Sequence, residues 1–120
     1  MTKAVLRIRR DTDAVLKEMG RRFASAWARG RPTAANVFSF ESPAALFRVL
    51  SPKRWELIER LQRVGPTSVR GLARALERDV KRVHEDVGVL IEVGLIEKAA
   101  GGKIHVPYSV ITADFALRAA

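Results

Sequence analysis

The second half of the sequence contains two amphipathic segments separated by a turn of only three polar residues, and few folds accommodate such a pair. The first segment, 69–76, has apolar residues at Val69, Leu72, Ala73 and Leu76, which is the spacing of one helix face. The second follows the turn at Glu77–Asp79, and its apolar positions are Val80, Val83, Val87, Leu90 and Ile91. With Asp79 as N-cap, we expect Val80, Val83 and Val87 to face the core. A glycine commonly ends a helix, so Gly94 closes the second segment.

Serine–proline pairs predict the starts of two earlier helices. Ser42 precedes Pro43 and Ser51 precedes Pro52; serine caps a helix and proline suits its first turn. We therefore expect helices over 44–49 and 52–64, the second ending at Gly65-Pro66. Thr67 or Ser68 then caps the helix at 69–76.

Short strands are expected on both sides of these helices. Residues 95–98 and 103–106 flank Ala-Ala-Gly-Gly, which predicts a β-hairpin. Residues 36–40 alternate in polarity as a strand does, and 109–118 fit either a final strand or a short helix.

The first 35 residues predict a strand over 3–10 and a helix over 12–29. Large apolar side chains of that helix recur every four residues at Met19, Phe23 and Trp27. They can pack on the core of the domain or on a second copy of the chain. We favour a homodimer in which these three residues and the strand at 4–9 form the interface, since paired subunits read paired half-sites. A basic amphipathic helix can also lie on an acidic membrane surface, but the strand before it and the motif after it favour no membrane role.

Composition narrows the classes of protein that remain. The chain has 120 residues, no cysteine and a formal net charge of +9, which indicates a small domain that meets a polyanion. Lys and Arg outnumber Asp and Glu by 13 to 6 in residues 1–60 and by 9 to 7 in residues 61–120. No apolar run approaches the roughly 20 residues of a membrane span, and no secretory signal is evident, so a cytoplasmic protein is expected.

The order helix, turn, helix and hairpin over 67–106, preceded by the helix at 52–64, resembles winged helix-turn-helix transcriptional regulators of the MarR-like kind. The resemblance covers 42–108 and is closest to small predicted bacterial and archaeal regulators, some of them encoded as antitoxins beside toxin genes. The matching positions are Leu72-Ala73, Leu76, Val83, Leu90 and Gly94-Leu95-Ile96. It implies a mainly α fold with a small β hairpin (α+β) and a DNA-binding function.

Candidate DNA contacts follow from the face of the second helix that points away from the core. Lys81, Arg82 and Glu85 point outward from its first two turns. Arg82 suits a bidentate contact with guanine, and Lys81 suits a phosphate or guanine. Glu85 either accepts a hydrogen bond from cytosine or keeps the helix soluble. The remaining candidates are Arg78 in the turn, Thr67, Ser68 and Arg70 at the start of the preceding helix, and Lys98 and Lys103 beside the hairpin tip.

A solvated face is the alternative interpretation of any one of these charges. Glu85 and Asp86 also repel phosphate, which favours a protein-interaction module to some degree. His84 and His105 lie 21 residues apart without a ligand pattern, and no motif for a nucleophile, a metal or a nucleotide is present. We therefore expect no enzyme, no catalytic residue, no metal and no cofactor.

The predicted organisation has a strand–helix extension at 1–35, a winged helix-turn-helix domain at 36–108 and a tail at 109–120. The leading hypothesis is a sequence-specific regulator that binds double-stranded DNA, a dimeric repressor that autoregulates its own operon. The alternative is an antitoxin or interaction subunit that binds and neutralises a partner toxin.

Overall fold

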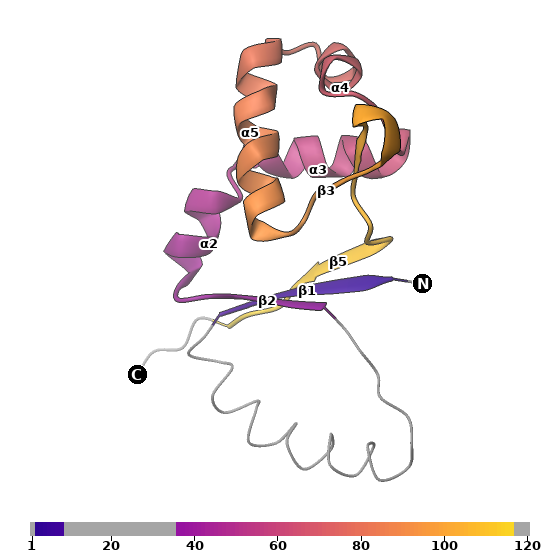
Figure 1. The fold of residues 1–120 in the computed structure, drawn as a ribbon. Helices are drawn as coiled ribbons and strands as arrows, with labels where there is room; N and C mark the ends of the chain where they lie inside the picture. The colour runs from indigo at the N-terminus through magenta and orange to yellow at the C-terminus, as the bar shows by residue number, and fades with distance from the viewer. Residues whose placement is uncertain (1, 9–35, 117–120) are drawn as a thin grey trace, which may run out of the picture. The chain divides into compact units, whose positions relative to one another are not determined.

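The structure is a computed structural model that describes residues 2–8 and 36–116. The chain forms two compact units (Figure 1). Residues 47–109 make up the helical unit, and the segments before and after it make up the sheet unit.

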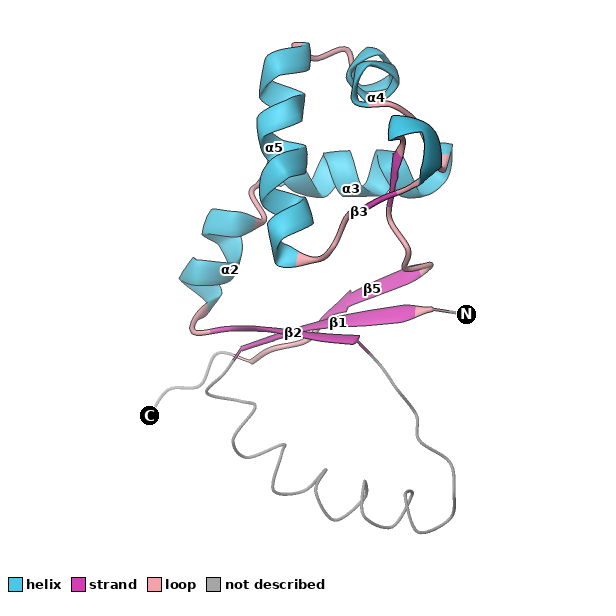
Figure 2. Cartoon of the chain, viewed as in Figure 1, coloured by secondary structure: helices cyan, strands magenta, loops and turns pink. Residues whose placement is uncertain are grey.

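The sheet unit contains three parallel strands, β1 (Lys3–Ile8), β2 (Asn36–Phe40) and β5 (Val110–Ala113), in the order β2-β1-β5 (Figure 2). In the central strand Leu6 pairs with Phe38 on one side and Ala113 on the other. Alternate residues of β1 are buried, as the two-residue period of a strand requires. The strand predicted at 3–10 is confirmed over residues 3–8, and the strand predicted at 36–40 is confirmed. The segment at 109–118 contains a strand. The predicted helix at 12–29, with Met19, Phe23 and Trp27, lies outside the described residues.

The two units differ from the predicted division at 35 and 108. Residues 36–40 pair with β1 instead of joining the helices, and residues 110–113 form an edge strand of the sheet instead of a tail. Parallel strands need long connections, and the whole helical unit lies in the chain between β2 and β5. Such pairing joins residues that are far apart in the chain, so local periodicity does not reveal it.

Helix α2 (Pro43–Val49) leads into the helical unit, which contains α3 (Pro52–Val64), α4 (Val69–Leu76) and α5 (Val80–Val93). All four helices start at side-chain caps. The Oγ atoms of Ser42, Ser51 and Ser68 accept from the backbone N–H groups of Ala45, Arg54 and Gly71, and Asp79 Oδ2 accepts from that of Arg82, at 3.0–3.4 Å. The predicted caps are therefore confirmed, with Ser68 rather than Thr67 at α4. Gly94 ends α5 with a φ of 100°.

The helical unit has a core of its own. Its buried residues are Leu50, Leu57, Ile58, Leu61, Leu72, Ala73, Val83, Val87, Leu90, Leu95, Ile96, Ile104 and Tyr108. The inward positions predicted for α5 are confirmed at Val83 and Val87 but wrong at Val80, which is 40% exposed. Val80 is the first residue of α5, and it precedes Val83, the first buried residue of that helix, by about one turn.

The predicted hairpin forms, but its strands are short. β3 (Glu97–Lys98) pairs antiparallel with β4 (Ile104–His105), and a turn at Ala100–Gly102 joins them. Gly101 and Gly102 adopt φ values of 74° and 72°, which glycine reaches without strain. Thr67, between α3 and α4, exchanges both backbone hydrogen bonds with Ile104 at 3.1 and 2.8 Å. The fold is thus α+β, and within the described residues no helix is long and apolar enough to cross a bilayer.

Candidate functional site

The exposed face of α5 carries the residues that the sequence singles out. Lys81, Arg82 and Glu85 are all exposed, while Val83 and Val87 fix the opposite face in the core. The cap at Asp79 sets where α5 begins and so fixes which side chains point outward. The first two turns of α5 therefore present two cations and a carboxylate to solvent.

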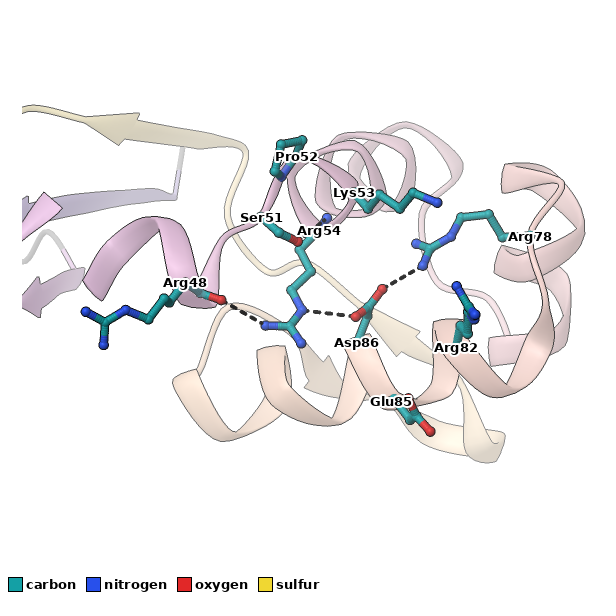
Figure 3. A pocket seen from close by; sticks show the side chains of 9 residues that line it. All are labelled: Arg48, Ser51, Pro52, Lys53, Arg54, Arg78, Arg82, Glu85 and Asp86. Carbon is teal, nitrogen blue, oxygen red and sulfur yellow. Dashed lines mark hydrogen bonds and ion pairs between the residues drawn. The ribbon is translucent and has the colours of Figure 1, made fainter. Parts of the chain in front are cut away.

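Asp86, one residue beyond this exposed group, is held between two arginines. Arg54 Nε lies 3.0 Å from Asp86 Oδ1 and Arg78 Nη2 lies 2.8 Å from Oδ2 (Figure 3). Arg54 Nη1 also donates to Val49 O at 2.9 Å and to Arg48 O at 3.4 Å. This Asp86 cluster of three side chains ties the start of α3 and the α4–α5 turn to α5.

The electrostatics of the cluster favour the charged carboxylate. Burial raises the pKa of the Asp86 carboxyl, but the hydrogen bonds and positive charges of Arg78 and Arg54 outweigh it and leave that pKa below its ordinary value. A carboxylate that accepts two charge-assisted hydrogen bonds is neutralised in place. The expectation that Asp86 repels phosphate therefore needs correction. Its negative charge is compensated by the two ion pairs with Arg54 and Arg78.

Arg78 lies in the turn before α5, as predicted, but its side chain does not point into solvent. Its side chain is only 16% exposed, since the guanidinium group turns inward to Asp86. Its Nη1 atom is buried and has no hydrogen-bond partner among the described residues. A buried donor without an acceptor is uncommon in folded proteins and calls for an explanation.

A groove of about 790 Å³ runs beside the Asp86 cluster, and we name it the α3-side groove. It is lined by Arg48, Ser51, Pro52, Lys53, Arg54, Arg78, Arg82, Glu85 and Asp86. Five of these residues are cationic and two are acidic. Within the described residues, the side chains of Lys53 and Arg82 form no ion pair.

A second hollow of about 570 Å³, the hairpin-side pocket, lies between α5 and the β3–β4 hairpin. Its lining includes Val87, Ile91 and Ile104, which are apolar, and His84, Lys98 and Lys103. The structure thus brings the predicted hairpin lysines to one pocket, while Arg78, Arg82 and Glu85 line the other groove.

The residues predicted at the start of α4 have separate roles. Thr67 uses its backbone to pair with Ile104, and Ser68 caps the helix through its Oγ atom. Arg70 is exposed. Val69, between these residues, lines the hairpin-side pocket, so the start of α4 lies beside it.

The described histidines do not join a ligand cluster. His105 Nε2 lies 3.9 Å from Glu97 Oε2 across the hairpin, and His84 lines the hairpin-side pocket. The described part of the chain contains no group of three or more His, Cys, Asp or Glu side chains placed to hold a metal ion.

Sequence reasoning missed the structural part of the site, which is Arg54 together with Asp86. One local signal existed, because Asp86 lies three residues after Val83 and directly before Val87, at the border of the buried face of α5. A carboxylate at such a border needs a partner. Its partners, 8 and 32 residues away in the chain, follow only from the packing of α3 against the rest of the unit.

The model of a protein family matches more than half of the chain. The model of a family described as HVO_A0114 matches residues 49–113, which is 65 of the 120 residues and spans α3 to β5. No curated protein and no solved structure matches the chain.

Proposed function

The chain belongs to the HVO_A0114 family, and we propose that it is a transcriptional regulator that binds double-stranded DNA through a winged helix-turn-helix. The observation that carries the proposal is α5, a capped helix with one face in the core and Lys81, Arg82 and Glu85 exposed over its first turns. A helix held in this way fits the major groove with its N-terminal residues toward the base edges.

The connectivity of the helical unit supports the winged helix-turn-helix interpretation. Helices α3, α4 and α5 are followed by the β3–β4 hairpin. The backbone pairing of Thr67 with Ile104 adds the linker before α4 to that hairpin as a third, one-residue strand. The hairpin is thereby the wing of the proposed domain, and α5 is its recognition helix.

Each group of exposed residues has a place in this proposal. Arg82 makes a bidentate contact with guanine, and Lys81 contacts guanine or a neighbouring phosphate. Lys98 and Lys103 on the wing and Arg70 at the start of α4 contact the DNA backbone. The Ser68 hydroxyl accepts from Gly71 N, which leaves its own proton for a phosphate oxygen.

The proposal extends to a homodimeric repressor that acts on its own operon and carries out no enzymatic reaction. A dimer doubles the contacted sequence, and half-sites one helical turn apart multiply the specificity of one helix.

The test is an anisotropy titration of the full chain against its own upstream DNA and against a scrambled duplex of equal length. Tighter binding to the native duplex is the expected result, and equal weak binding to both would refute sequence-specific recognition. Arg82→Ala should lose about 1–3 kcal/mol of discrimination at particular base pairs.

Arg60→Ala is the matched control for this variant. Arg60 is exposed on α3 and lines neither the α3-side groove nor the hairpin-side pocket. Its substitution therefore removes one positive charge, as Arg82→Ala does, and leaves the exposed face of α5 unchanged. If Arg60→Ala and Arg82→Ala reduce discrimination equally, Arg82 does not read bases.

A further inference from the structure

The α3-side groove gathers cationic groups from three separate parts of the helical unit. Lys53 comes from the first turn of α3, Arg78 from the α4–α5 turn and Arg82 from the first turn of α5. Figure 3 shows Lys53 extending toward the side of the groove where Arg78 and Arg82 lie, whereas the guanidinium group of Arg48 points away. Three cations therefore face one space although they are up to 29 residues apart in the chain.

The acidic residues of the groove do not cancel this charge. Asp86 is fully engaged by Arg54 and Arg78 at 3.0 and 2.8 Å, so that trio carries a net charge of +1. Lys53 and Arg82 add two further positive charges, and exposed Glu85 offsets only one of them. An anion entering the groove meets a net positive field at close range.

Arg78 supplies the most specific observation. Asp86 fixes the plane of its guanidinium group through Nη2, so the direction of the Nη1 donors is fixed as well. Nη1 is buried and lacks an acceptor among the described residues. An unmet buried donor costs free energy, and a phosphate oxygen is an acceptor that a guanidinium group prefers. The groups that cover Nη1 must move aside for this contact to form.

We propose that the α3-side groove binds a phosphate group of the DNA backbone through Lys53 and Arg78, and that Asp86 positions Arg78 for this contact. The inference rests on the proposed function and adds a backbone contact on the flank of α5 opposite the hairpin-side pocket. Such a contact fixes the register of α5 in the major groove and carries no sequence information itself.

The test measures the salt dependence of binding for the full chain, with Lys53→Ala as the main variant and Arg60→Ala as control. Both residues are exposed on α3, and both substitutions remove one positive charge. Because each neutralised phosphate contributes about 0.9 to the slope of log K against log salt, Lys53→Ala should reduce the slope by about that amount. The reduction should be the same on native and scrambled duplexes, and Arg60→Ala should leave the slope unchanged. Equal slopes for the two variants would overturn the proposal.

Asp86→Asn gives an independent test. The direction in which it changes DNA affinity distinguishes a positioning role of Asp86 from a simple effect of its charge. The substitution makes the protein more positive by one, so charge alone predicts tighter binding to DNA. Loss of the anchor for Arg78 predicts weaker binding, by several-fold on both duplexes, at a temperature where circular dichroism shows the variant folded. Tighter binding would refute the positioning role.

The source of the phosphate is tested with modified duplexes and with free phosphate. Replacement of single backbone phosphates by neutral methylphosphonates should reveal one position where the wild-type chain loses affinity and Lys53→Ala loses none. Inorganic phosphate, compared with chloride at equal ionic strength, should not displace the DNA. Displacement that depends on Lys53 would overturn the assignment of the groove to DNA. Sequence preference reports separately on the proposed function, so the two can fail independently.

Discussion

At the scale of single residues, Asp86 joins two arginines from separate parts of the helical unit. Its carboxylate is the shared acceptor of Arg54 and Arg78, and both arginines are about as buried as Asp86 itself. Removal of one partner from such a group leaves the other charges partly buried and uncompensated. The same residue therefore connects the stability of the helical unit with the geometry of the α3-side groove.

Asp86→Asn is expected to lower the free energy of unfolding by about 2–3 kcal/mol, less than the roughly 3–5 kcal/mol of a fully buried pair because the cluster is partly exposed. Urea unfolding at neutral pH measures the change. Glu59→Gln is the control, since Glu59 pairs with Arg63 at 3.2 Å on an exposed surface and should cost less than about 0.5 kcal/mol. Similar losses for both variants would contradict the structural role of the cluster.

The contribution of Asp86 depends on pH in a defined direction. Its folded-state pKa lies below the ordinary value of 3.8, so its stabilisation is complete above about pH 4 and disappears as the pH falls through the folded-state pKa. The stability difference between the wild-type chain and Asp86→Asn should therefore be constant near neutrality and shrink in acid. A difference that stayed constant down to the most acidic folded conditions would contradict this assignment.

Tyr108 is the only tyrosine in the chain, which makes its titration directly observable. Burial raises the pKa of its phenol and the negative charge of Glu97 raises it further, above the ordinary value of 10.0. The hydroxyl donates to Gly94 O at 3.3 Å, so the neutral form is the one that the fold holds. An alkaline absorbance titration should give a midpoint above 10, and Glu97→Gln should lower it. A raised pKa means that this stabilisation is present at neutral pH and is lost as the pH rises through the folded-state value.

Among the elements, the helices begin and end where local chemistry predicts. Caps at Ser51, Ser68 and Asp79 accept backbone N–H groups of the first turn, and Gly94 ends α5 in the left-handed region. Within the described helices, the two glycines Gly71 and Gly88 have opposite surroundings although both lower helix propensity.

Gly88→Ala and Gly71→Ala should therefore change stability in opposite directions. A Cβ atom at Gly88 would meet nothing within 4 Å, so alanine should stabilise α5 by about 0.5–1 kcal/mol. A Cβ atom at Gly71 would lie 2.5 Å from Thr67 Oγ1 and 3.2 Å from the Ser68 cap. Displacing that cap and crowding Thr67 should outweigh the gain in propensity and destabilise α4 by about 1 kcal/mol.

Thermal unfolding of both variants tests this contrast. Thr67→Ala removes the nearest atom, so the cost of Gly71→Ala should be smaller in that background. Equal stabilisation by the two alanines would show that the start of α4 is looser than its contacts indicate.

In the whole molecule, the helical unit is continuous in sequence while the sheet unit is not. The core of the helical unit, from Leu50 to Tyr108, comes from one continuous segment of the chain, residues 47–109. The sheet unit instead needs β1, β2 and β5 from distant parts of the chain.

A fragment of residues 47–109 is expected to fold without the sheet unit, because it contains a complete core. Far-ultraviolet circular dichroism should show helix, and heating should give a cooperative transition at a modest temperature, as is usual for a domain of about 60 residues. A chain carrying Leu6→Asp, which places a charge at a fully buried position of β1, should keep the same helical transition. A coil-like spectrum for the fragment would contradict the independence of the helical unit.

Elements were the most predictable level of this protein. The boundaries of α3, α4 and α5 follow from proline, glycine and capping residues close to each end, and the positive-φ glycines mark the hairpin turn. The exposed candidates Lys81, Arg82 and Glu85 follow from helical spacing alone. Val80 was placed wrongly, and the inward turn of the Arg78 side chain was not foreseen, because the surroundings of both residues depend on how the turn before α5 packs.

The sequence by itself determined where helices and turns lie and which face of each helix is apolar, because capping, periodicity and backbone preference act within a few residues. Only the tertiary structure decided that β1 pairs in parallel with β2 and β5, and that Arg54 and Arg78 share the carboxylate of Asp86. Those contacts join residues separated by 8 to more than 100 positions. Their free energy depends on burial and on charge separation in the packed chain, and no local pattern encodes either quantity.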